Sequence, residues 1–165
     1  MVTVLSTLDE LRAAVGAVAD PEIPVLTIDD LGILRGLEVE QGRVTVTITP
    51  TYSGCPAMDV IADDVRQVLA EHGHPDAVVR TVLAPAWTTD WMSEAGKRKL
   101  TEYGIAPPSA RSDSAVWLPS PVVRPRCPRC GSAETREISH FGSTACKSLW
   151  VCEACREPFD HFKAI

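Results

Sequence analysis

Two Cys-x-x-Cys pairs near the end of the chain constrain its fold more than any other feature of the sequence. The first pair is Cys127 and Cys130, and the second pair, after 21 intervening residues, is Cys152 and Cys155. Each pair can present two thiolates to one ion, and two pairs complete a tetrahedral site. The sequence therefore predicts one metal ion held by four cysteines.

The residues between the two pairs predict a β-hairpin. Segments 135–141 and 144–151 have strand character, and Gly142-Ser143 suits the turn between them. About 40 residues bury too little apolar surface to fold alone, so the metal would supply the folding energy. We expect a β-rich zinc ribbon over residues 126–165, with structural zinc as the metal and iron as its competitor.

Cys146 lies within the same segment but does not fit the same ion. If it lies on a strand, it is about 20 Å from Cys152 at roughly 3.3 Å per residue. Two interpretations stay open: a half-buried thiol of the hairpin, or a second thiol site. His140 and His161 are interpreted as surface or packing residues rather than metal ligands.

Composition divides the chain. Residues 107–125 hold five of the thirteen prolines and four serines, which predicts a linker between residues 1–106 and residues 126–165. Residues 1–106 carry 8 basic against 16 acidic side chains, which argues against nucleic acid as a ligand. No apolar run approaches the roughly 18 residues of a membrane helix, and the first residues do not form a signal peptide. We expect a cytoplasmic protein.

The first 106 residues predict a small α+β domain of order αββαβα with a three-stranded mixed sheet. A capping box at Thr7 and Glu10 predicts the first helix. The other expected elements are strands over 33–40 and 43–49 around Gln41-Gly42, a helix over 57–72, a buried strand over 77–83, and a helix over 93–103 that ends at Gly104.

The remaining cysteine, Cys55, lies in the segment Thr51-Tyr-Ser-Gly-Cys-Pro56 between a strand and a helix. Pro56 suits the first helical position, which would put Cys55 at the N-cap. The helix dipole would then lower the pKa of the thiol. Gly54 would allow close approach of a ligand to the backbone. The thiol is a candidate nucleophile or metal or cluster ligand, although most free cysteines are small buried side chains.

An acidic loop, residues 20–32, offers further candidates in Asp20, Glu22, Asp29 and Asp30. Turn and cap hydrogen bonds would explain these acids. However, ordered loops of this length are often functional. The segment Trp87-Thr-Thr-Asp-Trp91-Met92 is interpreted as core, with shielding of a site as the alternative.

Taken together, these motifs resemble a known family. The acidic loop, the Cys55 segment and Trp87–Trp91 are similar to the domain of SufT-type iron–sulfur assembly factors. With the cysteine pairs and Phe141-Gly-Ser-Thr-x-Cys146-Lys, the chain resembles over residues 7–163 the PaaD (PaaJ) family, which is encoded with the bacterial phenylacetyl-CoA ring epoxidase of aerobic phenylacetate degradation.

The resemblance implies an accessory, non-enzymatic role in maturation of an iron–sulfur cluster or iron centre in the oxygenase or reductase component. The functional thiol would be Cys55. The loop candidates would be Asp20, Glu22, Asp30, Thr51 and Gly54. A transient iron–sulfur cluster would take further ligands from a homodimer, Cys146 or a client, and the assembly machinery would be a partner.

Two other functions stay open. A thiol enzyme would use Cys55 as nucleophile, but His72 and His74 lie at the far end of the following helix, roughly 25 Å away. A zinc-ribbon adaptor would bind a protein through ribbon cations, because seven basic against five acidic side chains over residues 122–165 favour protein over nucleic acid.

Overall fold

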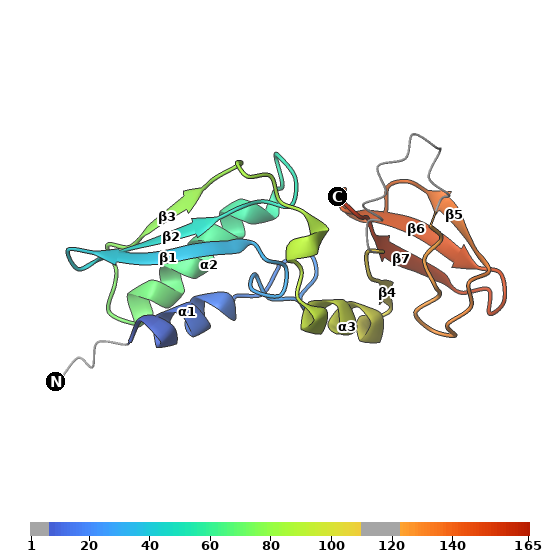
Figure 1. Ribbon diagram of the computed structural model, residues 1–165, viewed down its shortest axis with the longest axis horizontal. Coiled ribbons are helices and arrows are strands. Elements are labelled where there is room, and N and C mark those ends of the chain that lie inside the picture. The colour runs from blue at the N-terminus through green and yellow to red at the C-terminus, as the bar shows by residue number, and fades with distance from the viewer. Residues whose placement is uncertain (1–6, 110–122) are drawn as a thin grey trace. The chain divides into compact units, whose positions relative to one another are not determined.

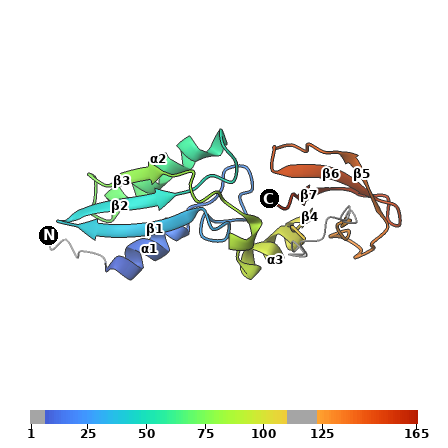
Figure 2. The same cartoon turned by 45° about the horizontal axis from the view of Figure 1, so that its top comes forward.

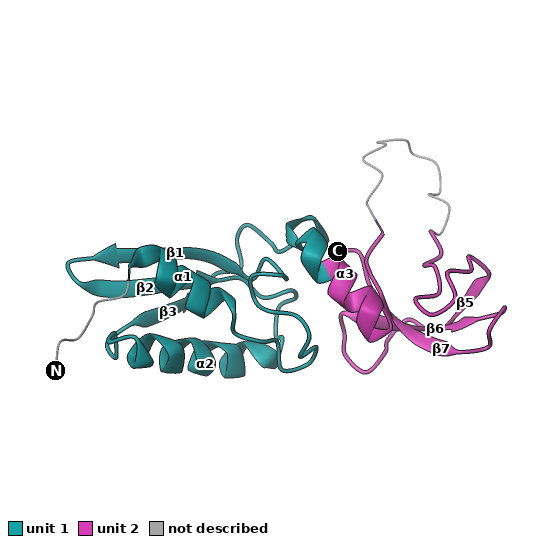
Figure 3. Ribbon diagram, turned by 90° about the horizontal axis from the view of Figure 1, so that it is seen from below, with its two compact units in different colours: residues 1–96 teal, residues 97–165 magenta. Residues whose placement is uncertain are grey.

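The computed structural model describes residues 7–109 and 123–165, and the chain divides into two compact units. Unit 1 is Met1–Gly96 and unit 2 is Lys97–Ile165 (Figure 3). Most of the expected linker, residues 110–122, lies outside the described residues.

Unit 1 is a three-stranded mixed sheet covered by two helices. β1 (Leu34–Glu40) pairs antiparallel with β2 (Arg43–Ile48), and β2 pairs parallel with β3 (Val78–Thr81), as Figure 2 shows. α1 (Leu8–Gly16) contacts β1, α2 (Ala57–Glu71) contacts β3, and the helices contact each other, so both cover one face of the sheet (Figure 1). The predicted α+β class and mixed sheet are confirmed.

Local sequence signals explain the boundaries of these elements. The Thr7 side chain accepts a hydrogen bond from the Glu10 N–H and the Glu10 carboxylate accepts one from the Thr7 N–H, so the predicted capping box begins α1. Gln41 and Gly42 both have positive φ in the turn between β1 and β2, which is the backbone that a tight hairpin needs. In β2, Val44, Val46 and Ile48 are buried, as their alternation predicted.

The prediction of a buried third strand is wrong. β3 covers four residues, of which Val78 and Val79 are half-buried and Arg80 and Thr81 are exposed. The physical reason is its position at the edge of the sheet, beside β2 alone. After β3, a short 3₁₀ helix (Thr89–Trp91) leads to α3 (Glu94–Tyr103), which ends at Gly104 with φ +93° as predicted.

Unit 2 contains a four-stranded sheet in the order β4-β7-β6-β5. Its strands are β4 (Ile105–Ala106), β5 (Thr135–Ser139), β6 (Lys147–Cys152) and β7 (Pro158–Phe162). The predicted hairpin is present as β5 and β6, although β6 begins three residues later than expected. β7, which follows the second cysteine pair, was not predicted.

The division of the chain also differs from the predicted one. The predicted boundary puts residues up to 106 in the first domain, whereas most of α3 and all of β4 belong to unit 2. The reason is that β4 pairs in parallel with β7, which buries Ala106 in a cluster with Trp150 and Phe159. A strand as short as β4, with two residues, leaves no pattern in the local sequence from which its pairing with β7 could be predicted.

Candidate functional site

The four paired cysteines converge on one point in unit 2. Their Sγ atoms all lie within 4.8 Å of one another. The Sγ atoms of Cys127 and Cys155 are 3.8 Å apart, and those of Cys130 and Cys152 are 3.5 Å apart. Ligands at about 2.3 Å from a tetrahedral ion are about 3.8 Å apart, so this donor set fits zinc.

The two cysteine pairs have the same backbone design. The Gly131 N–H donates to the Cys127 carbonyl, and the Arg156 N–H donates to the Cys152 carbonyl, both at 2.9 Å. Gly131 and Arg156, each four residues after the first cysteine of its pair, have positive φ. This left-handed residue closes each turn, so that two sulfurs of a pair face the same point.

Electrostatics at this cluster favour a cation. The backbone N–H of Cys155 donates to Cys152 Sγ at 3.5 Å and is the main reason that the pKa of Cys152 is lowered to about 7. The N–H of Glu157 favours the Cys155 thiolate, but desolvation and the neighbouring sulfurs outweigh it and raise the pKa of Cys155 to about 12. Four thiolates so close together repel one another, and a divalent ion removes that repulsion.

Cys146 is buried and does not belong to the four-cysteine cluster. Its Sγ lies 3.0 Å from the hydroxyl of Thr144, just before β6. The next residue, Lys147, is also buried and forms an ion pair with Asp160 at 3.4 Å. The expectation that Cys146 lies apart from the ion is consistent with this geometry, and its second-site role stays a prediction.

Cys55 lies in a turn before α2 and is partly exposed. The Cys55 N–H donates to the Tyr52 carbonyl at 3.3 Å, and the Met58 N–H donates to the Cys55 carbonyl at 3.3 Å. The N-cap of α2 is Pro56, one residue later than predicted, although Pro56 already has helical dihedral angles. Cys55 therefore precedes the cap by one residue.

The predicted lowering of the thiol pKa is also wrong. Burial raises the pKa of Cys55, and the carboxylates of Glu22 and Asp20 raise it further. The backbone N–H of Ala57 and the side chain of Tyr52 act in the opposite direction but do not outweigh burial. The structure thus brings the thiol within electrostatic range of two predicted acids, and adds Tyr52, which was not among the predicted site residues.

The acids of the loop have different roles. Oδ1 of Asp20 accepts hydrogen bonds from the N–H groups of Glu22 and Ile23 at 2.7 and 2.8 Å. The buried Asp30 accepts from the Thr27 N–H at 3.1 Å and from the Ser93 hydroxyl at 3.1 Å. Turn and cap chemistry therefore accounts for both residues, while Asp20 and Glu22 also influence the thiol.

The neighbouring candidates shape the loop. Thr51 is buried, and Gly54 has φ +85° with open space where a Cβ would stand, so its need for glycine is conformational. Trp87 is buried and its indole N–H donates to the Leu31 carbonyl at 2.8 Å, which confirms it as core. Trp91 is half-buried beneath the guanidinium of Arg35, 3.5 Å from the ring centroid.

Comparisons with known families match each part of this arrangement. The family described as "Iron-sulfur cluster assembly protein" matches residues 8–83, which include Cys55 and the acidic loop. The family described as "PaaD zinc beta ribbon domain" matches residues 113–163, which include all four clustered cysteines. Within the described residues, no helix is long and apolar enough to cross a membrane.

Individual proteins extend these matches. A protein of Escherichia coli (strain K12), named as one of the subunits of 1,2-phenylacetyl-CoA epoxidase, is 49% identical over 94% of this chain and 92% of its own length. An Fe-S protein maturation auxiliary factor of Porphyromonas gingivalis is 38% identical over 58% of this chain and 92% of that factor. The crystal structure of a DUF59 domain from Bacillus anthracis, 31% identical, superimposes with a TM-score of 0.51 over 56% of this chain and 90% of that one.

Proposed function

The chain belongs to the PaaD family of 1,2-phenylacetyl-CoA epoxidase subunits, and we propose that it is an accessory factor that matures an iron–sulfur cluster or iron centre of an epoxidase component. In this proposal the chain does not take part in the oxygenation itself. Cys55 is the functional thiol, and the four-cysteine cluster is structural.

The observation that carries the proposal is the surroundings of Cys55. The thiol is partly exposed on a turn, and two acids, Asp20 and Glu22, lie within electrostatic range of it. A factor that transfers a cluster must bind it and then release it by exchange of ligands. One accessible sulfur suits that task better than a closed site of four cysteines.

A thiol enzyme is less well supported by the same geometry. At the C-cap of α2, Nδ1–H of His72 donates a hydrogen bond to the Val68 carbonyl, 2.8 Å away. His72 follows Cys55 by 17 residues, so this imidazole is about 25 Å along the helix from the thiol. His72 is therefore too far from Cys55 to act as its general base.

The proposal also names the metal and the partners. Zinc is the metal of the four-cysteine cluster, and Cys127, Cys130, Cys152 and Cys155 hold it; bound there, it supplies folding energy to the ribbon. The clients are the oxygenase or reductase component, and the donor is the iron–sulfur assembly machinery. We propose the cytoplasm as the location, since free thiols persist in a reducing compartment.

Replacement of Cys55 by serine tests the role of the thiol. Serine preserves the size and polarity of the side chain but removes the soft sulfur ligand. Cells with Cys55→Ser are expected to lose growth on phenylacetate, with reduced iron or cluster content in one epoxidase component and unchanged metal in the ribbon. Cys146→Ser, made separately, shows whether the buried second thiol contributes as well, as its predicted second-site role requires.

Epoxidase that was matured in wild-type cells should turn over normally without this protein. Full metal content of the epoxidase components in a deletion strain would contradict the maturation role. Normal growth of the Cys55→Ser strain would instead contradict only the role of the Cys55 thiol and leave the maturation role in place.

A further inference from the structure

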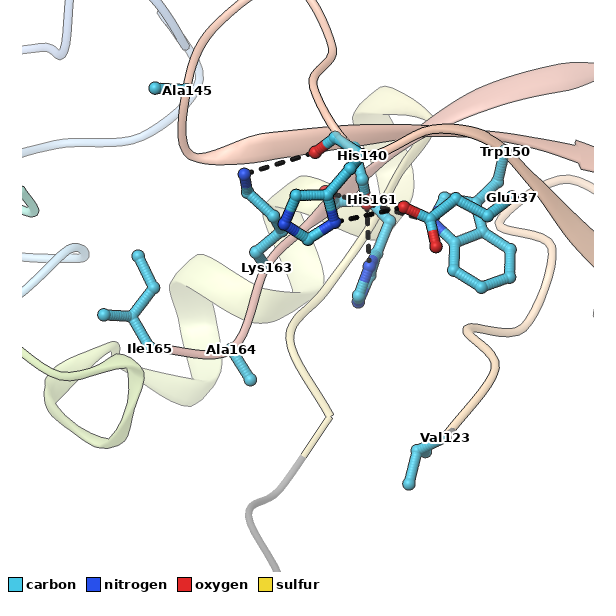
Figure 4. Close-up of a pocket in the computed structure, with 10 residues that line it drawn as sticks. Val123, Glu137, His140, Ala145, Trp150, His161, Lys163, Ala164 and Ile165 are labelled. Atoms are coloured by element: carbon cyan, nitrogen blue, oxygen red, sulfur yellow. Dashed lines mark hydrogen bonds and ion pairs between the residues drawn. The ribbon is translucent and has the colours of Figure 1, made fainter. Parts of the chain in front are cut away.

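Unit 2 contains a cavity of about 410 Å³ that neither cysteine site uses. Val123, Trp150 and Ala164 contribute apolar groups to its wall, and Glu137, His161 and Lys163 contribute polar ones (Figure 4). Its volume lies in the range of small-molecule sites, about 300–1,000 Å³. The cavity is therefore large enough to hold an organic ligand.

The feature that points to a ligand is the imidazole of His161. The residue is 9% exposed, and its Nε2 is buried without a hydrogen-bond partner among the residues that the structure describes. A buried polar atom normally has a partner, because loss of its hydration is otherwise uncompensated. A ligand in the cavity would supply the missing partner.

The neighbours of His161 decide whether Nε2 donates or accepts. The indole N–H of Trp150 can only donate, and it donates to Ser148 Oγ at 2.9 Å. The Ser148 hydroxyl lies 3.4 Å from Nδ1 of His161 and 3.5 Å from the His161 carbonyl.

The Ser148 hydroxyl donates its one proton to the His161 carbonyl, so Nδ1 of His161 must supply the proton of its own contact with Ser148 Oγ. The Lys163 N–H donates to the Cys146 carbonyl, so alternation along the antiparallel pair makes Ser148 and His161 a hydrogen-bonded pair, and the second lone pair of the His161 carbonyl serves the hydroxyl. Burial lowers the pKa of His161 to about 4, so its ring is neutral at neutral pH. A neutral imidazole that donates at Nδ1 carries no proton on Nε2, and Nε2 is then a buried acceptor.

We propose that this cavity binds a small uncharged aromatic molecule through an N–H group that donates a hydrogen bond to His161 Nε2. Trp150 and His161 meet edge to face, with centroids 6.0 Å apart, and such aromatic walls favour a ring as the ligand body. This inference does not depend on Cys55 or on the proposed function.

The charges around the cavity argue for an uncharged ligand. The Lys163 ammonium donates to the His140 carbonyl at 3.2 Å and lies over the ring of Phe141, 4.4 Å from the centroid. Figure 4 shows this ammonium beside His140, while the imidazole of His161 extends toward the side on which Val123 lies. A carboxylate beside His161 would therefore lose hydration without gaining a cation.

Benzamide and toluene are the probes that test this site, because they share the ring and differ in the amide group, whose N–H can donate to Nε2. Binding is measured on the full, metal-loaded chain by titration in heteronuclear NMR, with the indole signal of Trp150 as the reporter. Benzamide is expected to bind at millimolar concentration and about tenfold more tightly than toluene, which is the effect of one buried hydrogen bond. Benzoate is expected to bind more weakly than benzamide.

His161→Phe removes the acceptor but keeps an aromatic ring, and it should abolish the difference between benzamide and toluene. Ser148→Ala removes the hydroxyl that fixes the tautomer of His161 and leaves the imidazole itself in place. This variant should reduce that difference. His140→Gln is the control at an exposed lining residue and should leave the difference unchanged. Equal binding of benzamide and toluene to the wild-type chain, or binding of neither, would overturn the proposal even if His161→Phe did not fold.

Discussion

Cys55 shows how much the surroundings of one residue decide its chemistry. Its place just before a helix suggests an acidic thiol, yet burial and the carboxylates of Glu22 and Asp20 raise its pKa. The hydrogen bond from the Tyr52 side chain acts against this rise. At neutral pH the side chain is therefore mainly a thiol, which would lose its proton when it binds a metal or cluster.

Two substitutions that should change the reactivity of Cys55 in opposite directions test this account of its pKa. Tyr52→Phe removes a group that lowers the pKa of Cys55, so the thiolate fraction at pH 8 should fall and alkylation of Cys55 should slow roughly threefold. Glu22→Gln removes a negative charge and should accelerate alkylation by a similar factor. Mass spectrometry of the Cys55 peptide from metal-loaded protein measures both rates. A change of the same sign in both variants would contradict this account.

We expect Asp30 to act as a structural residue, although it belongs to the loop that contains Asp20 and Glu22. Its carboxylate joins the Thr27 N–H to the Ser93 hydroxyl, which in turn accepts from the Gly96 N–H near the start of α3. Asp30→Ala should lower the free energy of unfolding by about 2 kcal/mol, because two buried hydrogen bonds are lost.

Urea denaturation measures that loss, and Asp29→Ala is the matched control. Asp29 is exposed, so its replacement should change stability by less than about 0.5 kcal/mol. Alkylation of Cys55 should be unchanged in Asp30→Ala. A large change in that rate would mean that Asp30 acts on the thiol after all.

At the scale of elements, the end of the acidic loop at Gly32 depends on a close approach to the 3₁₀ helix that contains Trp91. Gly32 has φ +69°, and a Cβ built on it would stand 2.5 Å from the carbonyl oxygen of Trp91. The loop and the 3₁₀ helix can pack this closely only because Gly32 has no side chain. Gly42 has a similar φ of +79° but open space around it.

Alanine variants at these two positions distinguish the cost of a steric clash from the cost of a left-handed backbone. Gly42→Ala should cost about 1 kcal/mol of unfolding free energy, the cost of a left-handed backbone for alanine. Gly32→Ala should cost at least about 3 kcal/mol, because the backbone of Trp91 must also move. Equal losses of unfolding free energy in the two variants would show that the backbone of Trp91 moves aside at little cost.

At the scale of the whole molecule, the two units use different sources of stability. Unit 1 has a continuous apolar core between its sheet and helices, with Leu11, Ile28 and Ile61 fully buried. In unit 2, the buried cluster around Trp150 includes the metal-binding side chains of Cys127 and Cys152. Removal of the metal would leave two thiol groups in that cluster without their ion.

Chelation of the metal should therefore unfold the ribbon and spare unit 1. The indole N–H signal of Trp150 should collapse to an unfolded position in NMR spectra, while that of Trp87 stays in place. Metal analysis of the native protein should give about one equivalent of zinc. Loss of both indole signals together would show that the two units unfold as one, and less than half an equivalent of metal would contradict the four-cysteine site.

The sequence by itself determined the features that depend on neighbouring residues. Four of these features act over only a few positions, so the local sequence is enough to predict them. They are the capping box, the Gln41-Gly42 turn, the alternation of β2 and the Cys-x-x-Cys spacing. The four-cysteine cluster belongs to this class because each pair forms its own turn. The resemblance to an assembly domain likewise rests on short motifs.

Only the tertiary structure decided the features that depend on distant segments. β4 pairs with β7 across more than fifty residues, so the grouping of α3 and β4 with the ribbon could not be inferred from composition. The pKa of Cys55 is raised first by burial and then by acids more than thirty residues earlier in the chain, and a helix-dipole argument alone therefore gave the wrong sign. Burial and charge act through space, and a sequence reports only what lies along the chain.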